Sequence, residues 1–188
     1  STLVRIINAR NVRLKTQKMR PDTTEETFVP AWWLPEGHSQ TLWRKFSGAE
    51  TVAHVRNRVD LEDGDFIDVD FLSASQMDAA RQRALVVLLH GLCGSSSSSY
   101  ILSLQRHLST EGYRSIAMNF RGCSGELNRR GRAYHSGVSD DLQEVLNAVI
   151  ETFNPDAISL VGYSLGGNVL LKWLGEGRDY AVINRAVA

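Results

Sequence analysis

The sequence predicts an α/β fold in which a mostly parallel, twisted sheet is flanked by helices. Two observations carry this prediction. From residue 84 onward, short apolar strands alternate with amphipathic helices, which is typical of βαβ units. The segment 84–89 is an unbroken apolar run, as expected for a parallel strand that is buried on both faces.

An antiparallel hairpin is predicted ahead of the parallel part. Its strands are 51–60 and 65–71, joined by the turn signal Asp63-Gly64. Five carboxylates cluster here: Glu62, Asp63, Asp65, Asp68 and Asp70. Their spacing does not fit a calcium loop, so we interpret them as the outward positions of a half-exposed strand and expect no metal. The polar segment 73–83 then reads as a linker.

The later elements follow from their periodicity. Strands are predicted over 84–89, 113–120, 157–163 and from 181 to 188, and helices over 100–108, 138–153 and 165–174. The middle helix has the clearest inward face, formed by Leu142, Val145, Leu146, Val149 and Ile150. A late member of the serine run 95–99 is expected to cap the first helix.

Composition excludes several classes of protein. The chain has 188 residues, 43% of them hydrophobic, and no formal net charge, so no general attraction to nucleic acid is expected. The longest apolar run is far shorter than the roughly 20 residues of a membrane span, and the start does not resemble a secretory signal. Cys93 and Cys123 have no metal-ligand spacing and read as reduced thiols, which fits a cytoplasmic protein.

The N-terminal segment differs from the rest. Residues 1–27 form a basic and polar extension, and the basic side chains lie within its first 20 residues, where no acidic residue occurs. We expect it to be disordered, with a basic arm or targeting segment as the alternative. Residues 28–188 are assigned to the folded domain. Within its start, Trp32, Trp33, Leu34 and Trp43 either pack an N-terminal arm onto the domain or contact a membrane, which leaves peripheral membrane association open.

The strongest chemical signal is the segment Gly162-Tyr163-Ser164-Leu165-Gly166. An apolar strand leads into it and a helix leads out, which is the context of a nucleophile elbow. Glycines two before and two after the serine remove side chains that would collide with neighbouring backbone. The sequence therefore predicts Ser164 as a catalytic nucleophile, with Tyr163 beside the substrate.

A second signal is His90-Gly91-Leu92-Cys93-Gly94, directly after the strand 84–89. An oxyanion hole of this kind needs two backbone N–H donors, and we predict those of Leu92 and Leu165. Gly91 lets the loop approach substrate, and His90 is expected to shape the loop through hydrogen bonds. Cys93 has no apparent base and is not the predicted nucleophile.

A third signal is the polar stretch 119–141, which includes Arg121, His135 and the pair Asp140-Asp141. We interpret most of it as a capped loop in which Arg121 binds a carboxylate and Ser139 or Asp140 starts the next helix. The alternative is a substrate-side loop with His135 near the pocket.

Taken together, the motifs resemble one family. They are Gly37-His38-Ser39-Gln40-Thr41, Leu61-Glu62-Asp63-Gly64-Asp65-Phe66, His90-Gly91-Leu92, Phe120-Arg121-Gly122-Cys123-Ser124-Gly125, Tyr134-His135-Ser136-Gly137 and Gly162-Tyr163-Ser164-Leu165-Gly166-Gly167-Asn168. From about residue 28 onward the chain resembles the YheT-like branch of the α/β-hydrolases, which includes embryogenesis-associated and abhydrolase-domain proteins. The resemblance implies a serine carboxylic-ester hydrolase that forms an acyl-enzyme with short- to medium-chain acyl esters or lipids, with no cofactor.

The resemblance also sets a limit. In this fold the catalytic serine is followed along the chain by an acid and then a histidine, but no histidine follows Ser164 here. We therefore expect a fold that stops after about the sixth strand, with the acid and base beyond residue 188 and this segment inactive by itself. An acyltransferase using the same site and a non-catalytic binding module remain alternatives, and the oligomeric state is open.

Overall fold

The computed structural model describes residues 6–8, 30–33, 35–37, 53–72, 84–178 and 181–188. The chain divides into two units, one of Ser1–Thr16 with Val52–Ala188 and the other of Gln17–Thr51. In the second unit Trp32 and Trp33 are 91% and 49% exposed, while Leu34 and Trp43 lie outside the described residues. The two interpretations of this tryptophan-rich segment therefore stay predictions.

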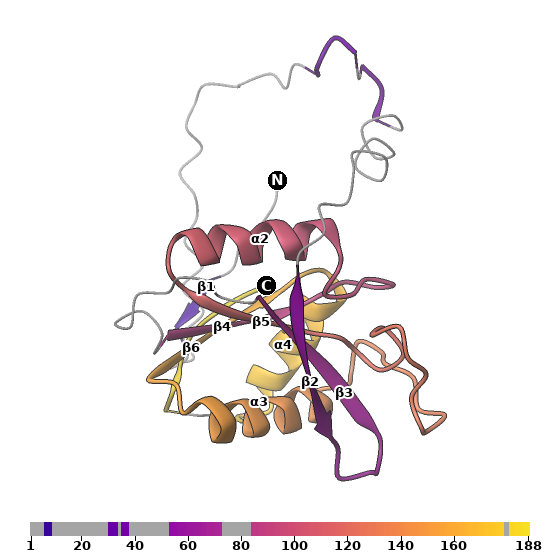
Figure 1. The fold of residues 1–188 in the computed structure, drawn as a ribbon, viewed down its shortest axis with the longest axis vertical. Helices are drawn as coiled ribbons and strands as arrows, with labels where there is room; N and C mark the ends of the chain where they lie inside the picture. Colours follow the sequence, from indigo (N-terminus) through magenta and orange to yellow (C-terminus); the bar gives the residue numbers. More distant parts are fainter. Residues whose placement is uncertain (1–5, 9–29, 34, 38–52, 73–83, 179–180) are drawn as a thin grey trace. The chain divides into compact units, whose positions relative to one another are not determined.

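The first unit is built on a seven-stranded sheet in the order β1-β7-β6-β4-β5-β3-β2 (Figure 1). Its centre is parallel and consists of β4 (Ala84–Leu89), β5 (Arg114–Met118), β6 (Ala157–Gly162) and β7 (Ile183–Val187). The predicted hairpin is β2 (His54–Asp60) and β3 (Phe66–Leu72), and β3 pairs antiparallel with β5. The predicted fold class is confirmed.

One strand was not predicted from the sequence. Residues Ile6–Asn8 form β1, which pairs antiparallel with β7 at the edge of the sheet opposite the hairpin. The other residues of the predicted extension lie outside the described part of the chain, so their disorder stays a prediction.

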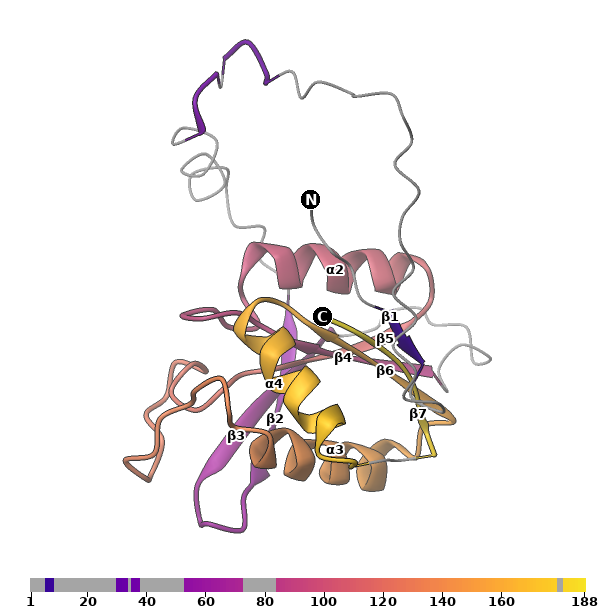
Figure 2. The same cartoon turned by 180° about the vertical axis from the view of Figure 1, so that it is seen from behind.

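In the described part of the chain, three helices cover the two faces of the sheet (Figures 1 and 2). Helix α2 (Ser99–Thr110) lies on one face, and α3 (Asp140–Phe153) and α4 (Leu165–Gly175) lie on the other. Each is within three residues of its predicted bounds. The predicted cap of α2 is only half right, because Ser98 is the N-cap but its hydroxyl accepts the Ser95 N–H and not a helix N–H.

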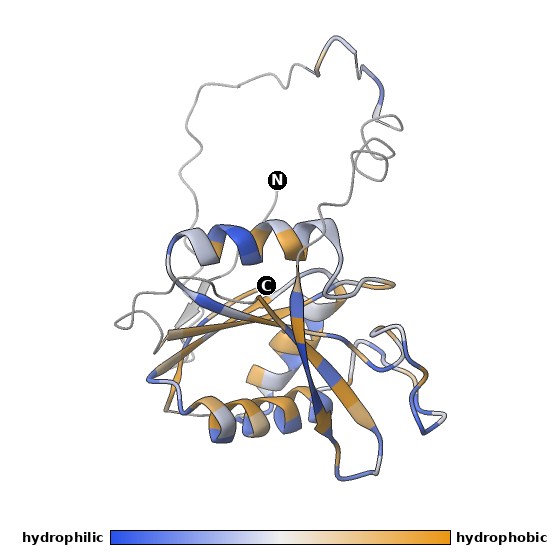
Figure 3. Cartoon of the chain, in the orientation of Figure 1, coloured by the Kyte–Doolittle hydropathy of each residue, from blue (hydrophilic) through white to orange (hydrophobic). Residues whose placement is uncertain are grey.

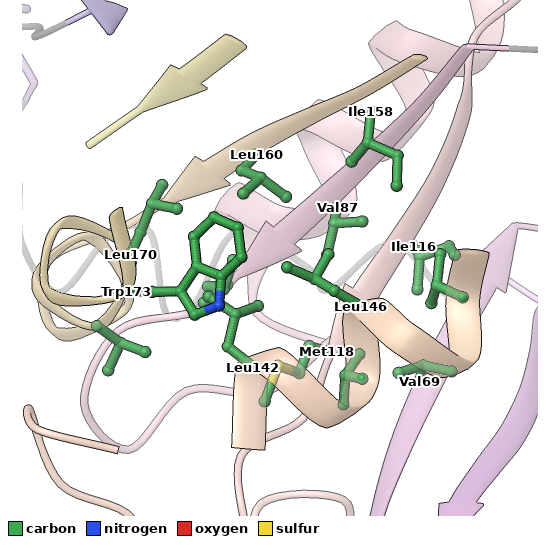
Figure 4. Packing of buried hydrophobic residues seen from close by; sticks show 14 of the residues in the cluster. Val69, Val87, Ile116, Met118, Leu142, Leu146, Ile158, Leu160, Leu170 and Trp173 are labelled. Atoms are coloured by element: carbon green, nitrogen blue, oxygen red, sulfur yellow. The ribbon is translucent and has the colours of Figure 1, made fainter. Parts of the chain in front are cut away.

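The main core lies between the sheet and the pair α3 and α4. Inward side chains of β3 to β7 meet the predicted apolar face of α3, whose Leu142, Val145 and Leu146 are fully buried. Figure 4 shows Leu142 and Leu146 packed among side chains of the central strands. Trp173 from α4 is also fully buried, and its indole N–H donates to Gln143 of α3 at 2.9 Å. A smaller cluster under α2 contains Val86, Leu88, Ile101 and Ala117. The central strands are accordingly apolar in Figure 3.

The interpretation of the hairpin carboxylates was wrong. Asp65, Asp68 and Asp70 are buried, so β3 is not half-exposed, and polar bands cross it in Figure 3. Arginines neutralise them: Arg58 binds Asp68 through two hydrogen bonds of 2.8 and 3.0 Å, and Arg56 binds Asp70 through two of 2.7 and 2.8 Å. The carboxylates thus anchor the hairpin by bidentate ion pairs.

Candidate active site

Ser164 lies on a strained turn between β6 and α4. Its backbone has φ 51° and ψ −112°, a conformation that costs a non-glycine residue roughly 1–3 kcal/mol, and its side chain is exposed. The turn is held by hydrogen bonds: the Tyr163 N–H donates to the Leu89 carbonyl at 3.0 Å, and the Gly166 N–H donates to the Tyr163 carbonyl at 2.9 Å. The strand, sharp turn and helix predicted around Ser164 are therefore present in the structure.

Two glycines make this turn sterically possible. A Cβ on Gly162 would lie 2.6 Å from the Gly166 carbonyl oxygen and the Gly167 nitrogen. A Cβ on Gly166 would lie 2.6 Å from the His90 carbonyl oxygen. Real Cβ atoms essentially never approach other atoms so closely, so both positions require glycine if the turn is to keep its shape.

The loop after β4 lies beside Ser164. A Cβ on Gly91 would be 3.4 Å from the Ser164 Cβ and from the Tyr163 carbonyl oxygen. Because β4 and β6 are parallel neighbours, the loops that follow them emerge at the same edge of the sheet. Two sequence motifs that lie about seventy residues apart thus form one site.

His90 orients this loop and is not exposed to solvent. Its Nε2 accepts the Phe120 N–H at 3.1 Å, so the ring proton is on Nδ1, which lies 2.7 Å from the Gly91 carbonyl oxygen and donates to it. Burial lowers the pKa of His90, which outweighs the opposite effect of the Gly91 bond and keeps the ring neutral. The expectation that His90 shapes the loop fits this geometry.

The two predicted N–H donors have no hydrogen-bond partner among the residues that the structure describes. The Gly91 carbonyl is fixed by His90 and by the Gly94 N–H at 3.1 Å. Since a trans peptide is planar, the Leu92 N–H points away from that carbonyl. Within the described part of the chain, neither the Leu92 N–H nor the Leu165 N–H makes a hydrogen bond. Leu165 begins α4, where the helix dipole adds positive potential.

The remaining candidates are placed differently. The Tyr163 ring packs against Tyr100, with centroids 4.8 Å apart. His135 is exposed and its Nδ1 accepts the Gly137 N–H at 3.0 Å. Among the described residues no hydrogen bond links His135 to Ser164, so its proximity to substrate stays a prediction. Cys93 is exposed, and burial raises the pKa of the Cys123 thiol.

A buried arginine connects the loop after β5 to α3 and to the hairpin turn, and the prediction that Arg121 binds a carboxylate is confirmed. Arg121 forms two hydrogen bonds of 2.8 Å with Asp141 of α3 and one of 2.9 Å with Asp65 of the hairpin turn. It also contacts Asp63 at 2.8 Å. These charges raise the pKa of Arg121, which therefore stays a cation and joins three elements.

A cavity of about 230 Å³ lies elsewhere, between the β2–β3 hairpin and α3. Its lining includes Arg58, Phe71 and Thr152 but no residue of the elbow or of the loop after β4. It gives no support to a second reaction centre.

Comparison with known proteins identifies the fold. Residues 84–180 match the family model described as the alpha/beta hydrolase fold. The chain is 38% identical over 158 residues to YheT of Escherichia coli (strain K12), and 37% identical over 157 residues to phospholipase ABHD3 of Homo sapiens. These matches cover 82% and 80% of the chain but only 46% and 38% of the two relatives.

The chain belongs to the YheT-like branch of the α/β-hydrolase family. The resemblance inferred from its motifs is confirmed. Among solved structures, XC6422 from Xanthomonas campestris, described as a serine hydrolase without lid, superposes with a TM-score of 0.55. That match has 24% identity and covers 69% of this chain and 59% of the other, so it supports the fold alone. The chain spans less than half the length of the two curated relatives.

Two tyrosines at this α/β-hydrolase site were missed from the sequence. Tyr100 begins the helix after the serine run and reads as a core position, and Tyr134 precedes the more conspicuous His135. Their hydroxyls bind the N–H groups of Gly91 and Cys93. In the sequence, only the place of Tyr134 in the motif Tyr134-His135-Ser136-Gly137 indicated that it could contribute to the site.

Proposed function

We propose that the complete protein is a serine hydrolase that cleaves carboxylic esters through an acyl-enzyme at Ser164. One observation carries the proposal: an exposed serine on a strained turn lies at the start of a helix, close to the loop after β4, and the Leu92 and Leu165 N–H groups of these two segments have no hydrogen-bond partner among the described residues. Relatives named phospholipase ABHD3 and, at 26% identity, monoacylglycerol lipase ABHD2 of Danio rerio support acyl esters or lipids as substrates.

The reaction follows from these groups. A base takes the proton of the Ser164 hydroxyl, and its oxygen attacks the ester carbonyl carbon. The carbonyl oxygen becomes an anion that the Leu92 and Leu165 N–H groups stabilise. The alcohol leaves with the proton held by the base, and water then cleaves the acyl-enzyme to release the acid. No step in this sequence needs a cofactor.

The base lies outside the described residues in this proposal. His90 is buried with both ring nitrogens engaged, and the described contacts of His135 do not include Ser164. The relatives extend well beyond the matched length, so the activity is proposed for the complete protein and not for this chain by itself.

A fluorophosphonate probe tests the proposal on the complete protein as its natural gene encodes it. We expect labelling at Ser164 and turnover of a p-nitrophenyl ester. Ser164→Ala should lose labelling and lower kcat by about 10⁶-fold, the scale seen when a hydrolase loses its nucleophile. The matched control is Ser97→Ala, another exposed serine, which should change neither.

Two results would count against the proposal. Turnover that survives Ser164→Ala would exclude this nucleophile, and a complete protein that neither labels nor turns over ester would favour the binding module. Adding an alcohol acceptor separates hydrolysis from acyl transfer, since a transferase forms a new ester in preference to the free acid.

A further inference from the structure

The loop after β4 carries four consecutive N–H groups whose partners differ in an informative way. The Gly91 N–H donates to the Tyr100 hydroxyl at 2.9 Å, and the Cys93 N–H donates to the Tyr134 hydroxyl at 2.8 Å. The Gly94 N–H donates to the Gly91 carbonyl. Only the Leu92 N–H has no partner in the part of the chain that the structure describes. Among the described contacts, the two N–H groups bound by tyrosine hydroxyls therefore lie on either side of the unpaired Leu92 N–H.

Both hydroxyls belong to rings with fixed surroundings. Tyr100 is in the first turn of α2, and its ring packs on Tyr163, the residue before the nucleophile. Tyr134 stacks on Phe120, with centroids 5.4 Å apart and planes 7° apart. The two acceptors are thus held by groups that also border the elbow and the loop.

The tyrosines reach the loop from different parts of the fold. Tyr100 comes from the helix that follows the loop, and Tyr134 comes from the long connection between β5 and α3. Without these hydroxyls, three adjacent N–H groups of the loop could each donate to the carbonyl oxygen of a substrate. Because the hydroxyls occupy the N–H groups of Gly91 and Cys93, only the Leu92 N–H is left to donate.

We propose that Tyr100 and Tyr134 are positioning residues that aim the Leu92 N–H at the reacting carbonyl oxygen. This inference rests on the proposed function, because it concerns the oxyanion donor of that reaction. Donors act in catalysis through preorganisation at the position that the oxyanion will occupy. A misplacement of about 1 Å at a reacting centre can cost about 10²-fold in rate.

The test uses Tyr100→Phe, Tyr134→Phe and the double variant in the complete protein. Phenylalanine keeps each ring and removes only the hydroxyl. Tyr113→Phe is the matched control, since Tyr113 is exposed and lies at neither loop. We expect kcat for a p-nitrophenyl ester to fall about 10-fold in each single variant and about 100-fold in the double variant, on the scale of a lost oxyanion donor. KM should stay within about twofold, because ground-state binding is not the target.

A second measurement separates positioning from a merely structural role. A boronic acid forms a tetrahedral adduct with a serine nucleophile, so its inhibition constant should weaken by the same factor as kcat/KM. The inference is overturned if kcat stays within about twofold of wild type, if the loss appears in KM alone, or if boronate affinity is unchanged. Should a phenylalanine variant fail to fold, 4-aminophenylalanine at that position keeps a polar group of similar size but is a weaker acceptor, because its nitrogen lone pair is delocalised into the ring. It should then give a smaller loss of kcat, and an unchanged kcat overturns the inference.

Ser164→Ala distinguishes failure of this inference from failure of the proposed function. If Ser164→Ala abolishes turnover while the tyrosine variants behave as wild type, only the positioning role fails. If Ser164→Ala retains turnover, the proposed function fails and this inference fails with it.

Discussion

Gly166 offers a direct test of how the elbow is built, because one added methyl group has no room there. In Gly166→Ala the new Cβ would lie 2.6 Å from the His90 carbonyl oxygen, 2.7 Å from the Leu89 carbonyl oxygen and 2.8 Å from the Leu89 Cβ. Ordinary contact begins at 3.4 Å, so the start of α4 and the end of β4 must separate by about 0.8 Å. The opposing atoms are backbone or Cβ atoms, which no rotamer change can move.

The expected cost follows from that displacement. Overpacking a well-packed site costs roughly 1–3 kcal/mol, and we expect the upper end here because the backbone itself must shift. The shift separates Ser164 from the loop that carries Leu92. We therefore expect fluorophosphonate labelling of Ser164 to slow by about 10²-fold, the scale of a misplacement near 1 Å.

The assay compares two identical substitutions in one helix. Gly175 ends α4, and a Cβ there meets nothing within 4 Å. Gly175→Ala should leave labelling unchanged and should alter the free energy of unfolding in urea by no more than about 1 kcal/mol, in the stabilising direction. The steric reasoning is refuted if Gly166→Ala labels at the wild-type rate and unfolds within about 0.5 kcal/mol of wild type.

Two further predictions concern the buried charges. Arg121→Met should lower the free energy of unfolding by about 3–5 kcal/mol, because Asp141 and Asp65 lose their buried cation. Adding Asp141→Leu should restore part of that loss, and no recovery in urea unfolding would contradict the pairing. Acid should also destabilise the hairpin. Burial alone raises the pKa of Asp68 and Asp70, but hydrogen bonds from Arg58 and Arg56 have the larger combined effect. Both pKa values are therefore lowered in the folded protein. With depressed folded-state pKa values, this stabilisation is complete above the unfolded pKa of about 3.9 and is lost as pH falls through the folded values. Urea unfolding as a function of pH should show an acid slope that shrinks in Asp68→Asn, and an unchanged slope would exclude this source.

The sequence predicted the elements of the parallel sheet well because each is governed by a local pattern. The run 84–89 is β4 to the residue, and the inward face predicted for 138–153 is buried in α3. Each of these segments shows a single periodicity, and a short apolar run that is buried on both faces is compatible with few structures other than a central strand. The elbow was equally local, since strand, turn and helix follow one another directly.

What the sequence could not predict depends on partners far away in the chain. The carboxylates of β3 looked like solvent-facing positions because alternation shows that a face is polar but not what covers it. Asp70, for example, meets Arg56 of β2, Ser96 of the loop after β4 and Asn119 after β5. No pattern within β3 contains those three residues.

The same reason explains why Leu92 could be proposed from the sequence as an oxyanion donor, while Tyr100 and Tyr134 could not be proposed as its supports. The choice of Leu92 rests on a motif of a few residues, whereas Tyr134 is 41 residues from the N–H that it binds. In a parallel sheet the loops that follow neighbouring strands meet at one edge. A loop whose motif can be recognised locally is therefore held in position by residues of the neighbouring loop. His90 shows both the local and the distant contribution. Its motif indicates the loop, but its tautomer is set by the Phe120 N–H, 30 residues later. Short motifs thus indicate the candidate reacting groups, whereas the residues proposed to position them can be identified only from the paired strands of the structure.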